Sequence, residues 1–190
     1  MANIKAIITD FDGTLVDTFE ANLLAYQEAF QSVGKELTEI EYRNCFGLRF
    51  DDFMREMNVK EKDIQMIIKE KKKDFYPTHF DKLKPNKALI QLIKNAKDSG
   101  IKTAIASTAR KENLMNALKH LQIESAFNLI FAGKNVDHGK PNPEIYLKTM
   151  AALSVDPQET LIFEDSQVGI LAALNSGANY IKIDHHFFEQ

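Results

Sequence analysis

The sequence predicts an α/β fold in which a mostly parallel, doubly wound sheet carries one helical insertion. Three observations lead to this prediction. Short runs rich in β-branched residues recur along the chain, helical patterns separate the later runs, and a long helical stretch interrupts the alternation early. Strands that alternate with helices form parallel sheets covered on both faces. A chain of 190 residues fits one such domain with a modest insertion.

The predicted strands are short apolar runs bounded by turn residues or polar residues. In chain order they cover residues 4–10, 101–107, 127–132, 160–165 and 180–183. The first run ends at an Asp-Gly turn, which is a common strand boundary. We therefore expect these five segments to form the sheet.

Helical patterns precede or separate the later strands. Residues 86–99 carry apolar side chains on one face and stop at Gly100, and residues 111–121 show a similar stripe. Asn142 and Pro143 offer a capping side chain and a first-turn proline for another helix. These segments are expected to cover the sheet.

A helical insertion follows the first strand. Apolar residues repeat at helical spacing over residues 19–33 and again over 64–75, and this part of the chain contains no convincing strand run. The sequence therefore predicts a helical domain over residues 18–81, inserted into a core formed by residues 1–17 and 82–190.

Composition excludes several classes of partner. The 24 Lys and Arg residues nearly balance 27 Asp and Glu residues, so a net charge of −3 offers no basic surface for nucleic acid. No signal peptide and no run able to span a bilayer is recognisable. The single cysteine excludes an internal disulfide and suits a reducing compartment. We expect a cytoplasmic protein, monomeric by default, with no nucleic-acid or membrane partner.

Residue spacing excludes several kinds of site. The 8 glycines form neither a G-x-G-x-x-G dinucleotide loop nor a G-x-x-x-x-G-K-[ST] phosphate loop. No serine lies in a G-x-S-x-G elbow, and the 5 histidines show no zinc-ligand spacing.

Reactive side chains instead follow the ends of predicted strands. Asp10 ends the first strand, Ser107 the second, and Glu164 with Asp165 the fourth, while Lys140 lies in the loop after the third. Each residue alone is more often a turn, a cap or a surface group. Ligands of doubly wound sheets, however, bind at the carboxyl ends of the strands. The set is therefore expected to converge on one site.

The chemistry of this set points to phosphoryl transfer. Asp12 lies two residues after Asp10 and, on a strand, would point to the same face. Mg²⁺ binds one or two carboxylates together with water and phosphate oxygens, and Lys140 and the Ser107 hydroxyl suit an anionic phosphate. One carboxylate can attack phosphorus, and the second can protonate the leaving oxygen and then activate water. Gly13 would permit a tight turn that exposes backbone amides to the phosphate.

Four segments resemble, in order, the motifs of the haloacid dehalogenase superfamily of phosphotransferases, in the branch that includes β-phosphoglucomutases and phosphoglycolate phosphatases. They begin at Asp10 (DFDGTLVDT), end at Ser107 (AIAS), surround Lys140 (GKPNPEIY) and begin at Phe163 (FEDSQVGILAALNSG). The motifs span almost the whole chain. The resemblance implies a Rossmann-like core with a small helical cap.

The resemblance also implies a role for each matched residue. Asp10 would be the nucleophile and a Mg²⁺ ligand, and Asp12 would be the general acid and base, with its backbone carbonyl on the metal. Asp165, and Glu164 directly or through water, would complete the metal site. Three side chains would bind the phosphate: those of Ser107, Thr108 and Lys140.

Three residues of the expected cap bear on the substrate. Asn22 stands where β-phosphoglucomutases carry a histidine, and Arg49 lies one place earlier than their cap arginine. Both differences favour a hydrolase over a mutase. Lys72 resembles a cap lysine that meets substrate in relatives, and a surface lysine in a charged helix is an equally good interpretation.

The sequence thus predicts a Mg²⁺-dependent phosphatase that acts on a small phosphorylated metabolite, such as a sugar phosphate, through an aspartyl-phosphate. A hexose phosphate mutase is the alternative. A non-catalytic binding module is more remote because both Asp10 and Asp12 are present.

Overall fold

The computed structural model describes residues 3–133, 136–184 and 188. The chain forms two compact units. One consists of Met1–Asp17 and Lys84–Gln190, and the other consists of Thr18–Leu83. The second unit is therefore inserted into the first.

The first unit is built on a five-stranded parallel sheet with the order β5-β4-β1-β6-β7. Its strands are β1 (Ala6–Thr9), β4 (Lys102–Ser107), β5 (Leu129–Ala132), β6 (Thr160–Glu164) and β7 (Asn179–Lys182). In the centre of the sheet, Ile8 pairs with Ala104 on one side and Ile162 on the other. The predicted α/β class is confirmed, and each strand begins and ends within two residues of its expected bounds.

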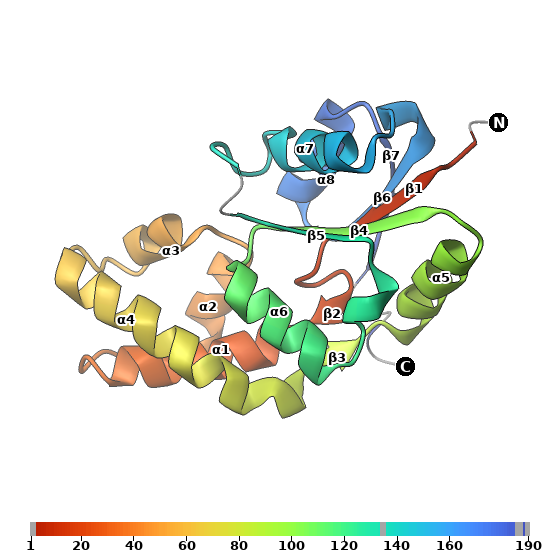
Figure 1. Cartoon of the computed structure of the whole chain (residues 1–190). Helices are drawn as coiled ribbons and strands as arrows, with labels where there is room; N and C mark the ends of the chain where they lie inside the picture. The colour runs from red at the N-terminus through yellow and green to blue at the C-terminus, as the bar shows by residue number, and fades with distance from the viewer. Residues whose placement is uncertain (1–2, 134–135, 185–187, 189–190) are drawn as a thin grey trace. The chain divides into compact units, whose positions relative to one another are not determined.

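Helices cover both faces of this sheet (Figure 1). They are α5 (Lys87–Asp98), α6 (Lys111–His120), α7 (Glu144–Leu153) and α8 (Gln167–Asn175). Figure 1 shows α7 and α8 on one face and α5 and α6 on the other. Short 3₁₀ turns, η2 (Glu124–Ala126) and η4 (Pro157–Glu159), precede β5 and β6.

Side-chain caps explain where several of these helices begin. Asn86 accepts a hydrogen bond from the Leu89 N–H at 3.0 Å, which satisfies one unpaired donor of α5. The sequence placed Pro143 in the first turn of α7, but the helix begins one residue later, at Glu144. The Asn142 side chain still accepts from the Glu144 N–H at 3.0 Å.

A two-stranded antiparallel ribbon joins the two ends of the first unit that flank the insertion. It consists of β2 (Val16–Asp17) and β3 (Lys84–Pro85). The sequence did not predict it, because two-residue strands are too short to show an alternating pattern.

The second unit is helical. Its elements are α1 (Phe19–Gln31), α2 (Glu39–Cys45), α3 (Phe50–Glu56), α4 (Lys62–Phe75) and the 3₁₀ segment η1 (Tyr76–Lys82). An aromatic cluster fills its centre, where the Tyr42 and Phe53 rings lie 5.8 Å apart and Tyr26 packs against both. Offset and edge-to-face contacts of this kind stabilise a small core beyond the area that they bury.

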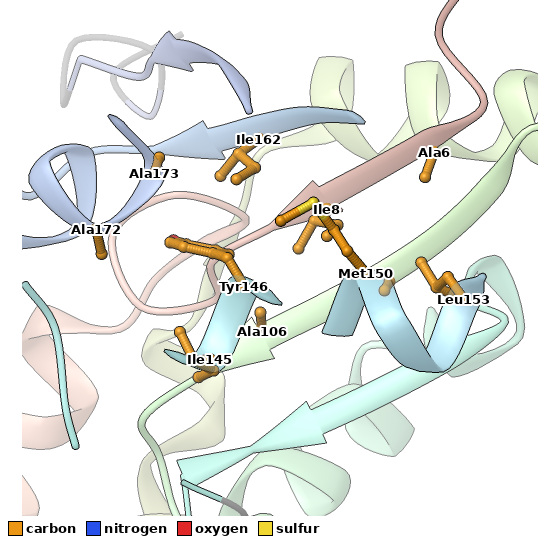
Figure 2. Close-up of a cluster of buried hydrophobic side chains, with 11 residues drawn as sticks. Ala6, Ile8, Ala106, Ile145, Tyr146, Met150, Leu153, Ile162, Ala172 and Ala173 are labelled. Atoms are coloured by element: carbon orange, nitrogen blue, oxygen red, sulfur yellow. The ribbon is translucent and has the colours of Figure 1, made fainter. Parts of the chain in front are cut away.

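The core of the first unit lies between the sheet and the pair α7 and α8 (Figure 2). Ile8 and Ile162 contribute from the strands, and Ile145, Tyr146 and Met150 contribute from α7. Within the described part of the chain, no helix has the length and apolar character needed to cross a membrane.

Candidate active site

The strand ends bring the expected residues together at one edge of the sheet. Asp10 directly follows β1, and its N–H donates to the Phe163 carbonyl of β6 at 3.0 Å. Ser107 is the last residue of β4, and Glu164 is the last residue of β6. The parallel arrangement therefore places a carboxylate, a hydroxyl and a second carboxylate on adjacent strands.

Lys140 supplies the positive charge at this edge. Its Nζ lies 2.7 Å from Asp10 Oδ1 and also contacts Glu164 Oε1. The Lys140 side chain is 7% exposed, the Asp10 side chain 10%, and the Glu164 side chain 0%. These three groups form a buried, charge-assisted network, in which hydrogen bonds are stronger than between neutral groups.

The Glu164 carboxylate accepts four hydrogen bonds. Oε1 accepts from Lys140 Nζ and from the Tyr146 hydroxyl, the latter at 2.8 Å. Oε2 accepts from the backbone N–H and the hydroxyl of Ser166, each at 3.1 Å. A carboxylate has about four acceptor positions. Glu164 is therefore fully satisfied by the protein.

Asp165 lies beside the turn that follows Asp10. Thr14 Oγ1 donates to Asp165 Oδ1 at 2.6 Å. Gly13 has a φ of +85°, and a β-carbon there would lie 2.3 Å from Asp165 Oδ2. Only glycine combines this backbone conformation with such close approach of a carboxylate.

The tight turn expected at Gly13 is present, and the Gly13 N–H closes it by donating to the Val16 carbonyl at 2.8 Å. Exposure of other backbone amides of this turn to a phosphate stays a prediction. One expectation was wrong: Asp10 and Asp12 do not share a strand face, because β1 ends at Thr9. Asp12 instead forms an isolated bridge with Val16 in the turn, where its side chain is partly exposed.

Burial and neighbouring charges shift the pKa values of Asp10 and Lys140. Burial raises the pKa of Asp10 well above its ordinary value; Lys140 opposes this rise, and neighbouring carboxylates add to it. Burial would lower the pKa of Lys140, but the nearby Asp10 carboxylate and Tyr146 outweigh it, so its pKa is raised well above the usual range. One lysine thus faces several carboxylates, and the site favours a further cation.

The donor set fits a hard cation such as Mg²⁺. Among the described residues, one group of acidic side chains could hold a metal ion, and it consists of Asp10, Glu164 and Asp165, whose nearest oxygens lie within 4.8 Å of one another. Mg²⁺ prefers such oxygens and takes only one or two carboxylates. Since Glu164 is satisfied by other donors, Asp10 and Asp165 are the best-suited ligands. A contribution from the Asp12 backbone carbonyl stays a prediction.

The expected phosphate ligands occupy the loop after β4. Ser107 is buried, and its Oγ accepts the Ala109 N–H at 3.0 Å, which leaves its own proton to donate. Thr108 is exposed. A β-carbon on Gly133, which follows β5, would lie 2.4 Å from the Thr108 carbonyl oxygen, so the backbone after β4 packs closely against the backbone after β5.

The candidates in the helical unit differ from one another. Asn22 is buried on α1, and its side-chain amide donates to the Thr18 carbonyl at 3.1 Å. Arg49 is exposed just before α3. Lys72 on α4 is half-buried, with Nζ 4.0 Å from the centre of the Tyr76 ring and 5.3 Å from that of Tyr26. Lys72 is thus held over two aromatic rings, and Asn22 bonds back to its own helix.

Sequence reasoning assigned no role to four residues that shape the site, although all four lie within the matched motifs. Tyr146, Ser166 and Thr14 donate to the carboxylates, and Gly169 leaves room for Glu164. Their place in these motifs is the signal that could have found them, and Tyr146 adds a polar tip on an apolar helix face six residues after Lys140.

A buried lysine among carboxylates lies at the carboxyl edge of a parallel sheet, which is where α/β enzymes of this architecture bind their ligands. The chain belongs to the haloacid dehalogenase-like hydrolase family, whose model matches residues 7–183. Because several relatives in this family are named as phosphatases, we assign the chain to the phosphoric monoester hydrolases.

Individual relatives agree with this family. The chain is 30% identical over 184 residues to the phosphorylated carbohydrates phosphatase of Thermotoga maritima, covering 94% of this chain and 84% of that protein. It is 27% identical over 185 residues to the β-phosphoglucomutase of Bacillus subtilis, covering 92% and 80%. The structure of CbbY from Rhodobacter sphaeroides with xylulose-1,5-bisphosphate superposes with a TM-score of 0.83 at 26% identity, covering 96% and 88%.

Proposed function

We propose that this protein is a Mg²⁺-dependent phosphatase that hydrolyses a small phosphorylated carbohydrate through an aspartyl-phosphate. The observation that carries the proposal is the Lys140–Asp10 contact of 2.7 Å beside Glu164 and Asp165. It joins a nucleophilic carboxylate, a cation for the phosphate and a set of metal ligands at the strand edge.

The chain's own residues would perform two displacements. In the first, an Asp10 oxygen attacks phosphorus, the bond to the leaving oxygen breaks, and Asp12 gives that oxygen a proton. In the second, Asp12 takes a proton from water, the water oxygen attacks phosphorus, and the bond to Asp10 breaks to release phosphate. Lys140, Ser107 and Thr108 would bind the phosphate oxygens throughout. Bound Mg²⁺, held by Asp10, Asp165 and the Asp12 carbonyl, would stabilise the charge that develops on these oxygens.

The names of the relatives support the substrate class. The Thermotoga relative is a phosphatase of phosphorylated carbohydrates, and CbbY binds a pentulose bisphosphate. The β-phosphoglucomutase relative acts on a sugar phosphate as well. A phosphorylated sugar is therefore the first class to test.

The helical unit would choose the substrate. We assign it the role of a cap, because caps that follow the first strand exclude water and select substrates. Arg49 and Lys72 are its candidate cations for a polar substrate. Asn22 is the weakest candidate, since its amide already bonds within α1.

Phosphate release from a panel of phosphorylated sugars, with Mg²⁺ or with EDTA, tests the proposal. We expect Mg²⁺-dependent release that Asp10→Asn abolishes, while the matched control Asp98→Asn, at the exposed end of α5, keeps full activity. Full activity of Asp10→Asn would refute the mechanism. The panel includes β-glucose 1-phosphate with its bisphosphate, since isomerised sugar phosphate without free phosphate would establish a mutase instead.

A further inference from the structure

The mechanism assigns no role to Tyr146, a buried side chain at the site. Tyr146 lies on α7 with 0% exposure, and its hydroxyl donates to Glu164 Oε1 at 2.8 Å. Lys140 Nζ contacts the same Oε1 and lies 5.1 Å from the centre of the Tyr146 ring. One tyrosine therefore contacts both the phosphate-binding lysine and the carboxylate that holds it.

The core fixes the direction from which this hydroxyl arrives. Figure 2 shows Tyr146 among the buried side chains between the sheet and α8, in a cluster that includes Ile8, Ile162 and Ala173. Close packing in such a cluster leaves a ring few alternative orientations. A buried phenol also needs a hydrogen-bond partner, and Glu164 is that partner.

Glu164 in turn is held from two sides. Tyr146 and Lys140 bind Oε1, while the N–H and hydroxyl of Ser166 bind Oε2. Without the tyrosine hydroxyl, Lys140 would be the one remaining donor to Oε1 among the described residues. The Glu164 carboxylate could then rotate, and the Lys140 ammonium could follow it. The ammonium could then move away from Asp10, which it meets at 2.7 Å.

We propose that Tyr146 is a positioning residue, whose hydroxyl and ring fix Lys140 Nζ beside Asp10 through the Glu164 carboxylate. This inference rests on the proposed function, because Lys140 is taken as the residue that binds the transferring phosphoryl group. Tyr146 itself does not touch that group.

Tyr146→Phe tests the proposal by removing one oxygen and leaving the packed ring. Tyr180→Phe, on the exposed strand β7, is the matched control. Three quantities are measured on each folded variant: kcat and KM for a hydrolysed phosphomonoester, the affinity for inorganic phosphate with Mg²⁺ present, and the affinity for Mg²⁺ alone. Thermal unfolding followed by circular dichroism checks the fold.

We expect Tyr146→Phe to lower kcat about tenfold and phosphate affinity about threefold, because a charged buried group loses a partner. KM and Mg²⁺ affinity should stay within about twofold of the parent values, and Tyr180→Phe should match the parent. Ser166→Ala, which loosens Oε2 instead, should show the same pattern with a smaller loss and serves if Tyr146→Phe does not fold.

Two results would overturn the inference. Unchanged kcat and phosphate affinity in Tyr146→Phe would show that the hydroxyl does not position Lys140. An equal loss of Mg²⁺ and phosphate affinity would show that Tyr146 supports the metal ligands instead. A parent protein that hydrolyses no phosphomonoester would count against the proposed function alone, since phosphate binding would still decide the role of Tyr146.

Discussion

The Glu164 carboxylate fills the space beside the α-carbon of Gly169 in the first turn of α8. A β-carbon on Gly169 would lie 1.9 Å from Oε1 and 2.2 Å from Oε2, distances that no real β-carbon shows. Glycine is required here by the buried acid and not by an unusual backbone conformation, because the residue is helical. The absence of a side chain at Gly169 of α8 thus makes room for the carboxylate of Glu164, the last residue of β6.

Gly169→Ala should therefore both destabilise the protein and reduce phosphate release at least about tenfold, because the alanine would displace Glu164 from Lys140. In an ordinary helix interior, the same change stabilises by about 1 kcal/mol. Thermal unfolding and kcat measure the two effects. The neighbouring exposed position offers the control Val168→Ala, which should keep its activity. An alanine variant with higher stability and full activity would show that Glu164 has room to move.

Much of this edge could be predicted from the sequence. Asp10, Ser107 and Glu164 each end or follow an apolar run, and parallel strands bring their carboxyl ends together whatever their separation in sequence. The strand-end rule needs only the strand boundaries, which short β-branched runs mark well. It predicted that these side chains converge without any knowledge of the side chains that surround them.

The remaining features depend on tertiary packing that local patterns do not record. The four donors on Glu164 come from three places, the Lys140 loop, α7 and the start of α8. The placement of Asp12 depends on where β1 ends, and a strand boundary is uncertain by a residue or two.

Lys140→Met should strongly destabilise the metal-free protein. It would leave the buried carboxylates of Asp10 and Glu164 without their cation, and breaking a buried pair costs about 3–5 kcal/mol. Thermal unfolding with EDTA measures the loss. Adding Mg²⁺ should stabilise the variant more than the parent, since the metal then becomes the main compensating charge. Equal unfolding temperatures without metal would contradict the role given to Lys140.

Gln122→Gly should stabilise the protein. Gln122 is exposed after α6 with a φ of +55°, and the Ile123 N–H donates to the Leu118 carbonyl across it at 3.1 Å, as in a glycine-terminated helix. Glycine adopts this conformation without the strain of a β-carbon, so we expect a gain of about 0.5–1 kcal/mol. Thermal unfolding should show a rise of about 2 °C for a chain of this size. The control Gln122→Ala keeps the strain and should show no gain.

Glu144 should make stability depend on pH in the acid range. Its carboxylate accepts from Lys148 Nζ, from the N–H groups of Asp137 and His138, and from the His138 ring, and these bonds lower its pKa to about 2. They hold the loop that leads to Lys140. A carboxylate whose pKa is lowered on folding stabilises the folded state at pH values above its ordinary pKa of about 4.5. This contribution is lost as the pH falls toward about 2.

Glu144→Gln isolates this contribution, because the amide cannot ionise. The unfolding temperature of the parent should exceed that of the variant at pH 5, and the gap should narrow steadily at lower pH. Glu124→Gln, at an exposed position on η2, controls for the loss of one surface charge. A gap at pH 3 that equals or exceeds the gap at pH 5 would mean that the ionised Glu144 does not hold the loop. Because that loop carries Lys140, we also expect phosphate release by Glu144→Gln to be lower than that of Glu124→Gln at pH 7.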